Sequence, residues 1–167
     1  TKALRDVTEA RGQRYFASAV GEVNVVEKMK QENAVIGGEG NGGVIYPELH
    51  YGLDALVGIA LFLSLLAKSG KTCSALRASY PNYEISKNKM ELTPEMNVDL
   101  ILEKMAKKYA DCEVLTTDGV KIMFKDEWVH LRKSNTEPII RIYSESRDMA
   151  AANALATKIM NEIKQLL

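Results

Sequence analysis

The sequence predicts two kinds of unit in succession: a partial mixed α/β/α layer unit, then a small antiparallel-sheet domain with two helices on one face. In the first half, helical spacing alternates with short apolar runs, whereas the second half shows a helix, short strands and a final helix. Leu-Thr-Pro at 92–94 is typical of a boundary. We therefore expect a first domain over residues 1–92 and a second over residues 93–167.

The first half opens with a helical pattern, so the first strand of its unit is expected to be missing. Ala-Val-Ile at 34–36 reads as a short buried strand that enters a glycine-rich segment. A further short strand is expected over 83–89. Helices are expected over residues 4–11, 23–29, 54–68 and 72–79.

The second half has the element order of an α+β domain. Apolar residues at helical spacing predict helices over 97–109 and from Asp148 to the end. Thr117-Asp118-Gly119 predicts a tight turn between the first two strands. The expected strands cover residues 113–116, 120–124, 128–133 and 139–144.

Bulk composition excludes several classes of protein. The 167 residues include 22 basic and 22 acidic side chains, so no overall field favours nucleic acid or an anionic membrane as a partner. The strands are also expected to lack the exposed, interleaved aromatic and basic residues of a nucleic-acid-binding sheet. The longest apolar run, 55–67, is too short to span a bilayer, and no signal-peptide core is found. Two distant cysteines fit a cytoplasmic protein.

A glycine-rich segment, Gly-Gly-Glu-Gly-Asn-Gly-Gly at 37–43, is the first candidate site. Backbone N–H groups at Gly38 and Gly40 are accessible to a ligand because no side chain covers them. Glu39 and Asn41 supply a carboxylate and an amide, which suit sugar hydroxyls. The alternative is a flexible surface turn. The two histidines, His50 and His130, are too isolated to predict a metal site or a catalytic pair.

A second candidate site lies in Leu-Arg-Lys-Ser-Asn-Thr-Glu-Pro at 131–138. A guanidinium, two hydroxyls and an amide around one tight loop suit phosphate oxygens. Arg141 either contacts the same anion or pairs with Glu137 to hold the loop. A polar hairpin with incidental charges is the alternative interpretation. The proposed phosphate ligands are Arg132, Ser134, Asn135 and Thr136.

Together, the segments at 37–55 and 132–143 resemble the α-D-phosphohexomutases, the family of phosphoglucomutase, phosphomannomutase and phosphoglucosamine mutase. The first half is similar to the later part of the family's third domain, and the second half to its TBP-like fourth domain. By this resemblance, Glu39 and Asn41 with Gly38 and Gly40 bind the sugar. The phosphate that is not being transferred binds to the loop at 132–136.

The resemblance also implies what this chain does not contain. Members of the family transfer phosphate through a phosphoserine and a bisphosphate intermediate, and an aspartate cluster holds Mg²⁺. Neither motif is found here, so no catalytic or metal-binding residue is expected in this chain. We expect a C-terminal fragment of an isomerase, inactive alone, whose partners are a hexose phosphate and the enzyme's N-terminal domains. The alternative is a non-catalytic sugar-phosphate-binding or assembly module.

One position departs from the family pattern. Leu53 stands where similar sequences have arginine in Tyr-Gly-Arg-Asp-Ala. If that arginine contacts substrate, its replacement weakens binding or indicates a divergent substrate site. The sequence leaves open which hexose is used and the oligomeric state.

Overall fold

The computed structural model describes residues 1–93, 96–134 and 136–166, which form two compact units. The N-terminal unit contains residues 3–81, and the sheet unit contains residues 1–2 and 82–167. The strand at 84–91 pairs along its whole length within the sheet unit, although the sequence places a boundary after residue 92. Backbone pairing therefore places this strand in the sheet unit, whereas the sequence boundary at Pro94 places it in the first domain.

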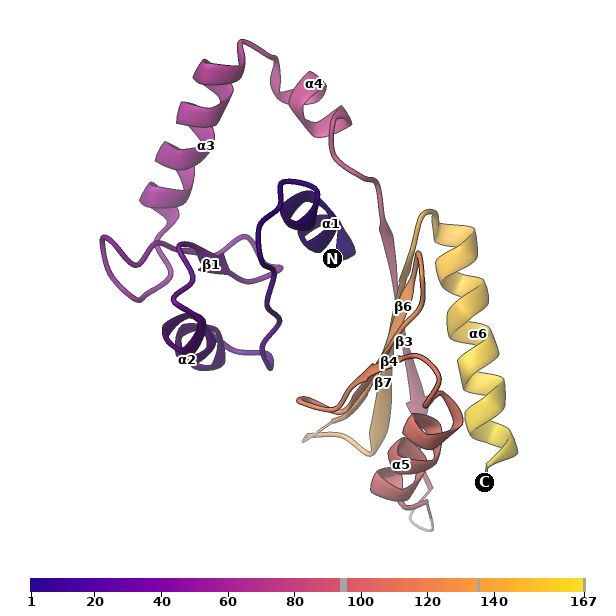
Figure 1. Cartoon of the computed structure of the whole chain (residues 1–167). Helices are drawn as coiled ribbons and strands as arrows, with labels where there is room; N and C mark the ends of the chain where they lie inside the picture. The colour runs from indigo at the N-terminus through magenta and orange to yellow at the C-terminus, as the bar shows by residue number, and fades with distance from the viewer. Residues whose placement is uncertain (94–95, 135, 167) are drawn as a thin grey trace. The chain divides into compact units, whose positions relative to one another are not determined.

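The N-terminal unit is mainly helical (Figure 1). The Asp54 side chain accepts a hydrogen bond from Val57 N and so caps the longest helix, which ends at a left-handed Gly70. The helices predicted from the sequence are confirmed within a few residues. The elements are α1 Lys2–Glu9, α2 Glu22–Glu32, β1 Gly37–Gly38, β2 Val44–Ile45, α3 Ala55–Ser69 and α4 Cys73–Ala78.

The expected buried strand over residues 34–36 is wrong. Asn33 adopts a left-handed conformation at the end of α2, and Ala34 N donates to Met29 O, so the chain turns sharply here. Val35 and Ile36 are 79% and 52% exposed. Strand pairing begins only at Gly37, which lies opposite Ile45. The partner strand, β2, follows the glycine-rich segment.

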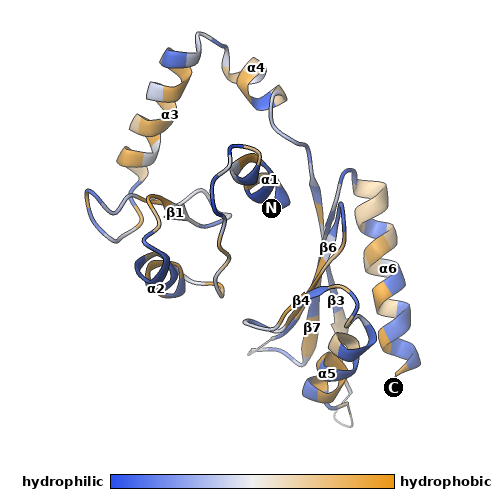
Figure 2. Cartoon of the chain, viewed as in Figure 1, coloured by the Kyte–Doolittle hydropathy of each residue, from blue (hydrophilic) through white to orange (hydrophobic). Residues whose placement is uncertain are grey.

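Helix α3 is apolar on most of its surface (Figure 2), yet all fifteen of its residues are described and none is buried. Globular helices normally bury an apolar stripe, and one that is apolar all round belongs inside a protein. Among the described residues, no helix has both the length and the hydropathy needed to cross a bilayer. The exposed large apolar side chains of α3 are Leu56, Ile59, Leu61, Phe62, Leu63 and Leu65.

The sheet unit contains one five-stranded antiparallel sheet in the order β3-β7-β6-β5-β4, with α5 and α6 beside it (Figure 1). The sequence strands are confirmed, and β3 is added at the edge next to β7. The elements are β3 Glu84–Glu91, α5 Val98–Lys108, β4 Glu113–Leu115, β5 Val120–Met123, β6 Trp128–Lys133, β7 Ile139–Ser146 and α6 Met149–Gln165.

Side-chain alternation gives the sheet two different faces. One face carries Val129, Leu131, Ile140 and Ile142, which pack with α5 and α6 in the core of the unit. Both helices therefore cover the same face, as predicted. The opposite face, called the outer face below, carries the intervening residues of each strand. The predicted fold class is confirmed.

In the N-terminal unit, the first residue of α2 fixes the loop before α3. Leu53 N donates a 3.0 Å hydrogen bond to Glu22 Oε1. We expect Glu22→Ala to increase the hydrogen-exchange rate of the Leu53 amide roughly fivefold, because a hydrogen bond contributes about 1 kcal/mol. Exposed Glu27 on the same helix is the control. An unchanged Leu53 rate in Glu22→Ala, or an equal increase in Glu27→Ala, would contradict this assignment.

In the sheet unit, His130 is partly buried on the outer face, opposite Lys121 and Tyr143. Burial is the main cause that lowers its pKa, and the positive charges of Lys121 and Arg132 act in the same direction. A hydrogen bond between Nε2 and the Asp118 carbonyl oxygen opposes this shift. The folded unit therefore disfavours the charged imidazole.

This lowered pKa makes stability depend on pH. As the pH falls below about 6.5, His130 is protonated in the unfolded chain before it is protonated in the folded unit. The folded unit therefore loses stability as the pH falls from about 6.5 toward the lower pKa of the folded His130. We expect the urea midpoint to fall between about pH 7.5 and 5.5, and to fall less in His130→Gln. The same pH dependence in wild type and His130→Gln would contradict this assignment of the pH effect to His130.

Candidate functional site

The glycine-rich segment is the turn of the β1–β2 hairpin and not a direct strand-to-helix loop. Glu39 N donates to Gly43 O at 3.0 Å, and Gly42 N donates to Glu39 O at 3.1 Å. A Cβ at Gly38 would collide with the carbonyl oxygen of Gly43, so the two backbone segments approach this closely only with glycine there. The segment is therefore a hydrogen-bonded turn and not an irregular loop.

Glu39 and Asn41 contact each other in this turn. Asn41 Nδ2 donates to Glu39 Oε2 at 3.1 Å, while Gly43 N donates to Asn41 Oδ1 at 2.9 Å. The amide thus fixes the orientation of the carboxylate. At Gly40, a Cβ would meet no described atom within 4 Å, so the backbone beside Glu39 has open space around it. The structure brings together all four residues of the predicted sugar site: Gly38, Glu39, Gly40 and Asn41.

Leu53, the position that departs from the family pattern, lies against this turn. A Cβ on Gly43 would contact both methyl groups of Leu53 and also Asn41 Oδ1. The contact between Leu53 and Gly43 is not predictable from sequence spacing. Nearby, His50 Nε2 lies 3.1 Å from Asp54 Oδ2. Hydrogen bonds from Val57 N and then from His50 lower the pKa of Asp54, which stabilises its ionised form.

The second predicted site follows β6. Arg132 lies directly opposite Arg141 in the β6–β7 pairing. Ser134 is buried, and its backbone N donates to Ile139 O, which closes the loop. Ser134 Oγ lies 3.4 Å from both Thr136 Oγ1 and Thr136 N. The structure thus brings together three of the predicted phosphate ligands, Arg132, Ser134 and Thr136. The fourth, Asn135, lies outside the described residues.

Asp118 is the partner of Arg132 that sequence reasoning missed. Arg132 Nε lies 3.0 Å from Asp118 Oδ1. Gly119 has φ of 72°, and a Cβ there would collide with the Leu131 carbonyl oxygen, so only glycine allows this turn so close to β6. Asp118 Oδ2 is buried and has no hydrogen-bond partner among the described residues. The turn was predictable from the sequence, but the contact between its Asp118 and Arg132 of the neighbouring strand β6 was not.

The geometry of Arg141 is compatible with both alternatives, an anion contact and a pair with Glu137. Arg141 Nη2 lies 3.8 Å from Glu137 Oε2, and both side chains are substantially exposed. A pair this long and exposed contributes at most about 1 kcal/mol. Arg141 therefore steadies the loop only weakly and keeps its guanidinium accessible.

The sheet register creates two contacts between basic and aromatic side chains that the sequence analysis did not identify. On the outer face, Lys121 Nζ lies 4.1 Å from the centre of the Trp128 ring, and Lys87 Nζ lies 5.7 Å from the centre of the Tyr143 ring. The partners of each contact lie on neighbouring strands, β5 with β6 and β3 with β7, so the contacts depend on the strand register.

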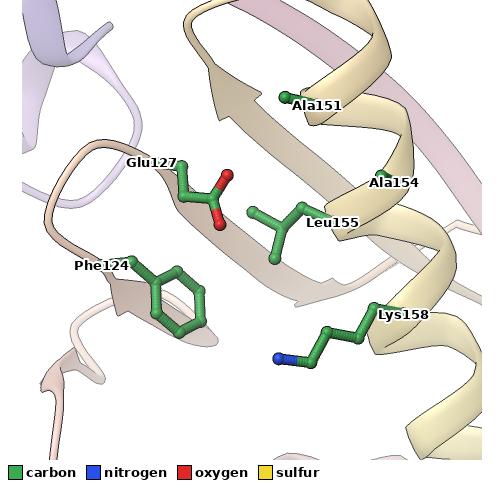
Figure 3. Close-up of a pocket in the computed structure, with 6 residues that line it drawn as sticks. All are labelled: Phe124, Glu127, Ala151, Ala154, Leu155 and Lys158. Carbon is green, nitrogen blue, oxygen red and sulfur yellow. The ribbon is translucent and has the colours of Figure 1, made fainter.

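A shallow depression lies elsewhere in the sheet unit, on the side of α6 (Figure 3). Leu155 and Lys158 of α6 face Phe124 and Glu127 across it, and it contains none of the predicted site residues. Within residues 1–93, 96–134 and 136–166, no three His, Cys, Asp or Glu side chains are grouped closely enough to hold a metal ion.

Comparison with known proteins identifies the chain's relatives. Residues 1–83 match the model of the phosphoglucomutase/phosphomannomutase α/β/α domain III, and residues 89–162 match that of the C-terminal domain. A phosphoglucosamine/phosphogalactosamine mutase of Sulfurisphaera tokodaii is 41% identical over 89% of this chain. A phosphoglucomutase/phosphomannomutase of Thermococcus kodakarensis is 37% identical over 95%. The chain spans 32% and 36% of the lengths of these two relatives.

A solved structure agrees with these sequence matches. The crystal structure of a phosphoglucomutase/phosphomannomutase family protein from Burkholderia thailandensis superposes with a TM-score of 0.74 at 25% identity. The match covers 98% of this chain and 35% of that protein. The two family models, the named relatives and this structure agree: the chain belongs to the phosphoglucomutase/phosphomannomutase family and corresponds to its domain III and C-terminal domain regions.

Proposed function

We propose that this chain is the substrate-binding C-terminal part of a phosphohexomutase that interconverts hexose 1-phosphate and hexose 6-phosphate. The relatives named above are mutases of phosphoglucosamine, phosphogalactosamine, phosphoglucose and phosphomannose, which supports this reaction class. The proposed substrate is a phosphate of glucosamine, mannose or glucose. These sugars differ at C2, and no residue of this chain is assigned to that position.

The phosphate end of the substrate is proposed to bind at Arg132, Ser134, Asn135 and Thr136, with Arg141 as a further contact. The observation that carries this proposal is the placement of two guanidinium groups in register beside a loop with a buried serine. Arginine presents a planar fork of donors to phosphate oxygens. Because Asp118 engages Arg132 at Nε, the Nη edge of that guanidinium is proposed to receive the phosphate.

The sugar end is proposed to bind at Glu39 and Asn41, with the backbone of Gly38 and Gly40. A carboxylate accepts hydrogen bonds from two vicinal hydroxyls, and its fixed orientation would discriminate between hydroxyl configurations. The hydrogen bond from Asn41 supports this role because it favours one orientation of the Glu39 carboxylate. In the full-length enzyme, the sugar loop and the phosphate loop are proposed to bind the two ends of one substrate.

The chemical step is proposed to belong to other parts of the enzyme. A phosphoserine there would transfer the phosphoryl group through a bisphosphate intermediate, and a Mg²⁺ bound there would neutralise the developing charge. The residues of this chain hold and orient the substrate, which accounts for much of phosphoryl-transfer catalysis. The isolated chain is therefore proposed to be inactive, and turnover of a hexose 1-phosphate by the pure fragment would contradict this.

The remaining domains of the same enzyme are the proposed protein partner. The exposed apolar surface of α3 supports this proposal, because each large apolar side chain gains roughly 1.5–3 kcal/mol on full burial. The proposed location is the cytoplasm, which fits the two free cysteines, Cys73 and Cys112. No nucleic acid or membrane is proposed as a partner.

The phosphate role of Arg132 is testable in the 167-residue chain. We expect Arg132→Ala to weaken binding of inorganic phosphate and glucose 6-phosphate about tenfold or more, because a hydrogen bond to a charged group contributes roughly 1.5–3 kcal/mol. Titrations followed by ¹H–¹⁵N NMR would measure the dissociation constants. Arg147→Ala is the matched control, since Arg147 also pairs with one carboxylate, that of Asp126 at 2.8 Å. Unchanged phosphate affinity in Arg132→Ala would remove the assigned role.

The sugar role of Glu39 calls for a different comparison. We expect Glu39→Gln to weaken binding of glucose 6-phosphate by about threefold to tenfold and to leave binding of inorganic phosphate unchanged, because only the hexose has hydroxyls to donate. Glu48→Gln, in the segment that follows β2, is the control, since Glu48 accepts a hydrogen bond from the Tyr46 hydroxyl. If Glu39→Gln binds both ligands like the wild type, the carboxylate does not bind sugar.

A further inference from the structure

The outer face of the sheet collects positive charge although the whole chain has a net charge of zero. Strand alternation and the pairing register place five basic side chains on this face. They are Lys87 and Lys89 of β3, Lys121 of β5, Arg132 of β6 and Arg141 of β7.

Three of these cations form one row across the sheet. Lys89 is paired with Arg141, and Arg141 is paired with Arg132, so the row crosses β3, β7 and β6. Side chains directly opposite each other have Cβ atoms about 4.5–5.5 Å apart, and like charges there are destabilising. A row of three cations therefore favours a bound anion. It ends beside the loop that contains Ser134 and Thr136.

The carboxylates near this row neutralise only part of its charge. Asp118 pairs closely with Arg132, while Glu137 lies 3.8 Å from Arg141. Lys89 is exposed and makes no hydrogen bond or ion pair within the described part of the chain. Glu91 lies on the same face two residues further along β3, but the two side chains are not within ion-pair distance in the structure.

The other two lysines of the outer face are engaged differently. Lys87 and Lys121 lie over the rings of Tyr143 and Trp128, where cation–π attraction holds them. Lys89 has no aromatic partner among the described residues. It is therefore the cation of this face whose ammonium is left for a ligand.

We propose that Lys89 is a further phosphate-binding residue and that the row Lys89–Arg141–Arg132 receives the phosphate dianion. This inference rests on the proposed function and deepens it. Neighbouring strands are about 4.8 Å apart, so a phosphate over the central Arg141 lies within reach of the long side chains on both sides. The lysine supplies a point charge, and the arginines supply directed donors.

The test is a titration of the 167-residue chain with inorganic phosphate, followed by ¹H–¹⁵N NMR. We expect Lys89→Gln to weaken phosphate binding about threefold or more, as for an exposed charge contact. Lys87→Gln is the matched control, because it removes the same charge from the same strand and face. Its phosphate affinity should equal that of the wild type. Wild-type affinity in Lys89→Gln, or an equal loss in Lys87→Gln, would overturn the proposal.

Two comparisons distinguish a failure of the Lys89 role from a failure of the whole phosphate site. If Arg132→Ala weakens phosphate binding but Lys89→Gln does not, the proposed function stands and the role of Lys89 is wrong. If neither variant changes the affinity, the phosphate site itself is wrong. A single-stranded oligonucleotide tests the remaining alternative: binding lost equally in Lys87→Gln and Lys89→Gln would indicate an extended polyanion surface and overturn the proposal. We expect no such binding.

Discussion

The register between β6 and β7 is the constraint on which the candidate phosphate site depends. Buried Val129, Leu131, Ile140 and Ile142 fix this register from the core side, because a slip of one residue would turn them toward the outer face. The same register places Arg132 opposite Arg141 on the other side of the sheet. Core packing thus positions two like charges together, and the turn at Asp118 and Gly119 supplies the carboxylate that makes this tolerable.

The two units are stabilised to different degrees by their own residues. The sheet unit buries a continuous core between five strands and two helices, so its loops rest on a rigid frame. The N-terminal unit holds its glycine turn mainly through local hydrogen bonds, such as those that Asn41 makes with Glu39 and Gly43. Its most apolar helix, α3, is left uncovered. This contrast fits a chain that spans about a third of its relatives' length.

Sequence patterns predicted the helices and the strands of the second half, because apolar periodicity reports burial directly. They failed at residues 34–36, where three apolar residues lie outside any strand because Asn33 turns the chain. Residue types also predicted which loops contain candidate ligands. Contacts between distant segments were not predictable: Asp118 with Arg132, Leu53 with Gly43, and Lys89 beside Arg141 all depend on register or packing.

The most direct test of this account observes the arginine side chains themselves. The Nε–Hε signals of Arg132, Arg141 and Arg147 can be followed in one ¹H–¹⁵N NMR titration of the chain with inorganic phosphate. The account predicts that the Arg132 and Arg141 signals shift together along one binding curve. The signal of Arg147, which follows the last residue of β7, stays in place. Arg132 and Arg141 signals that do not move at saturating phosphate, or that move no more than Arg147, would contradict it.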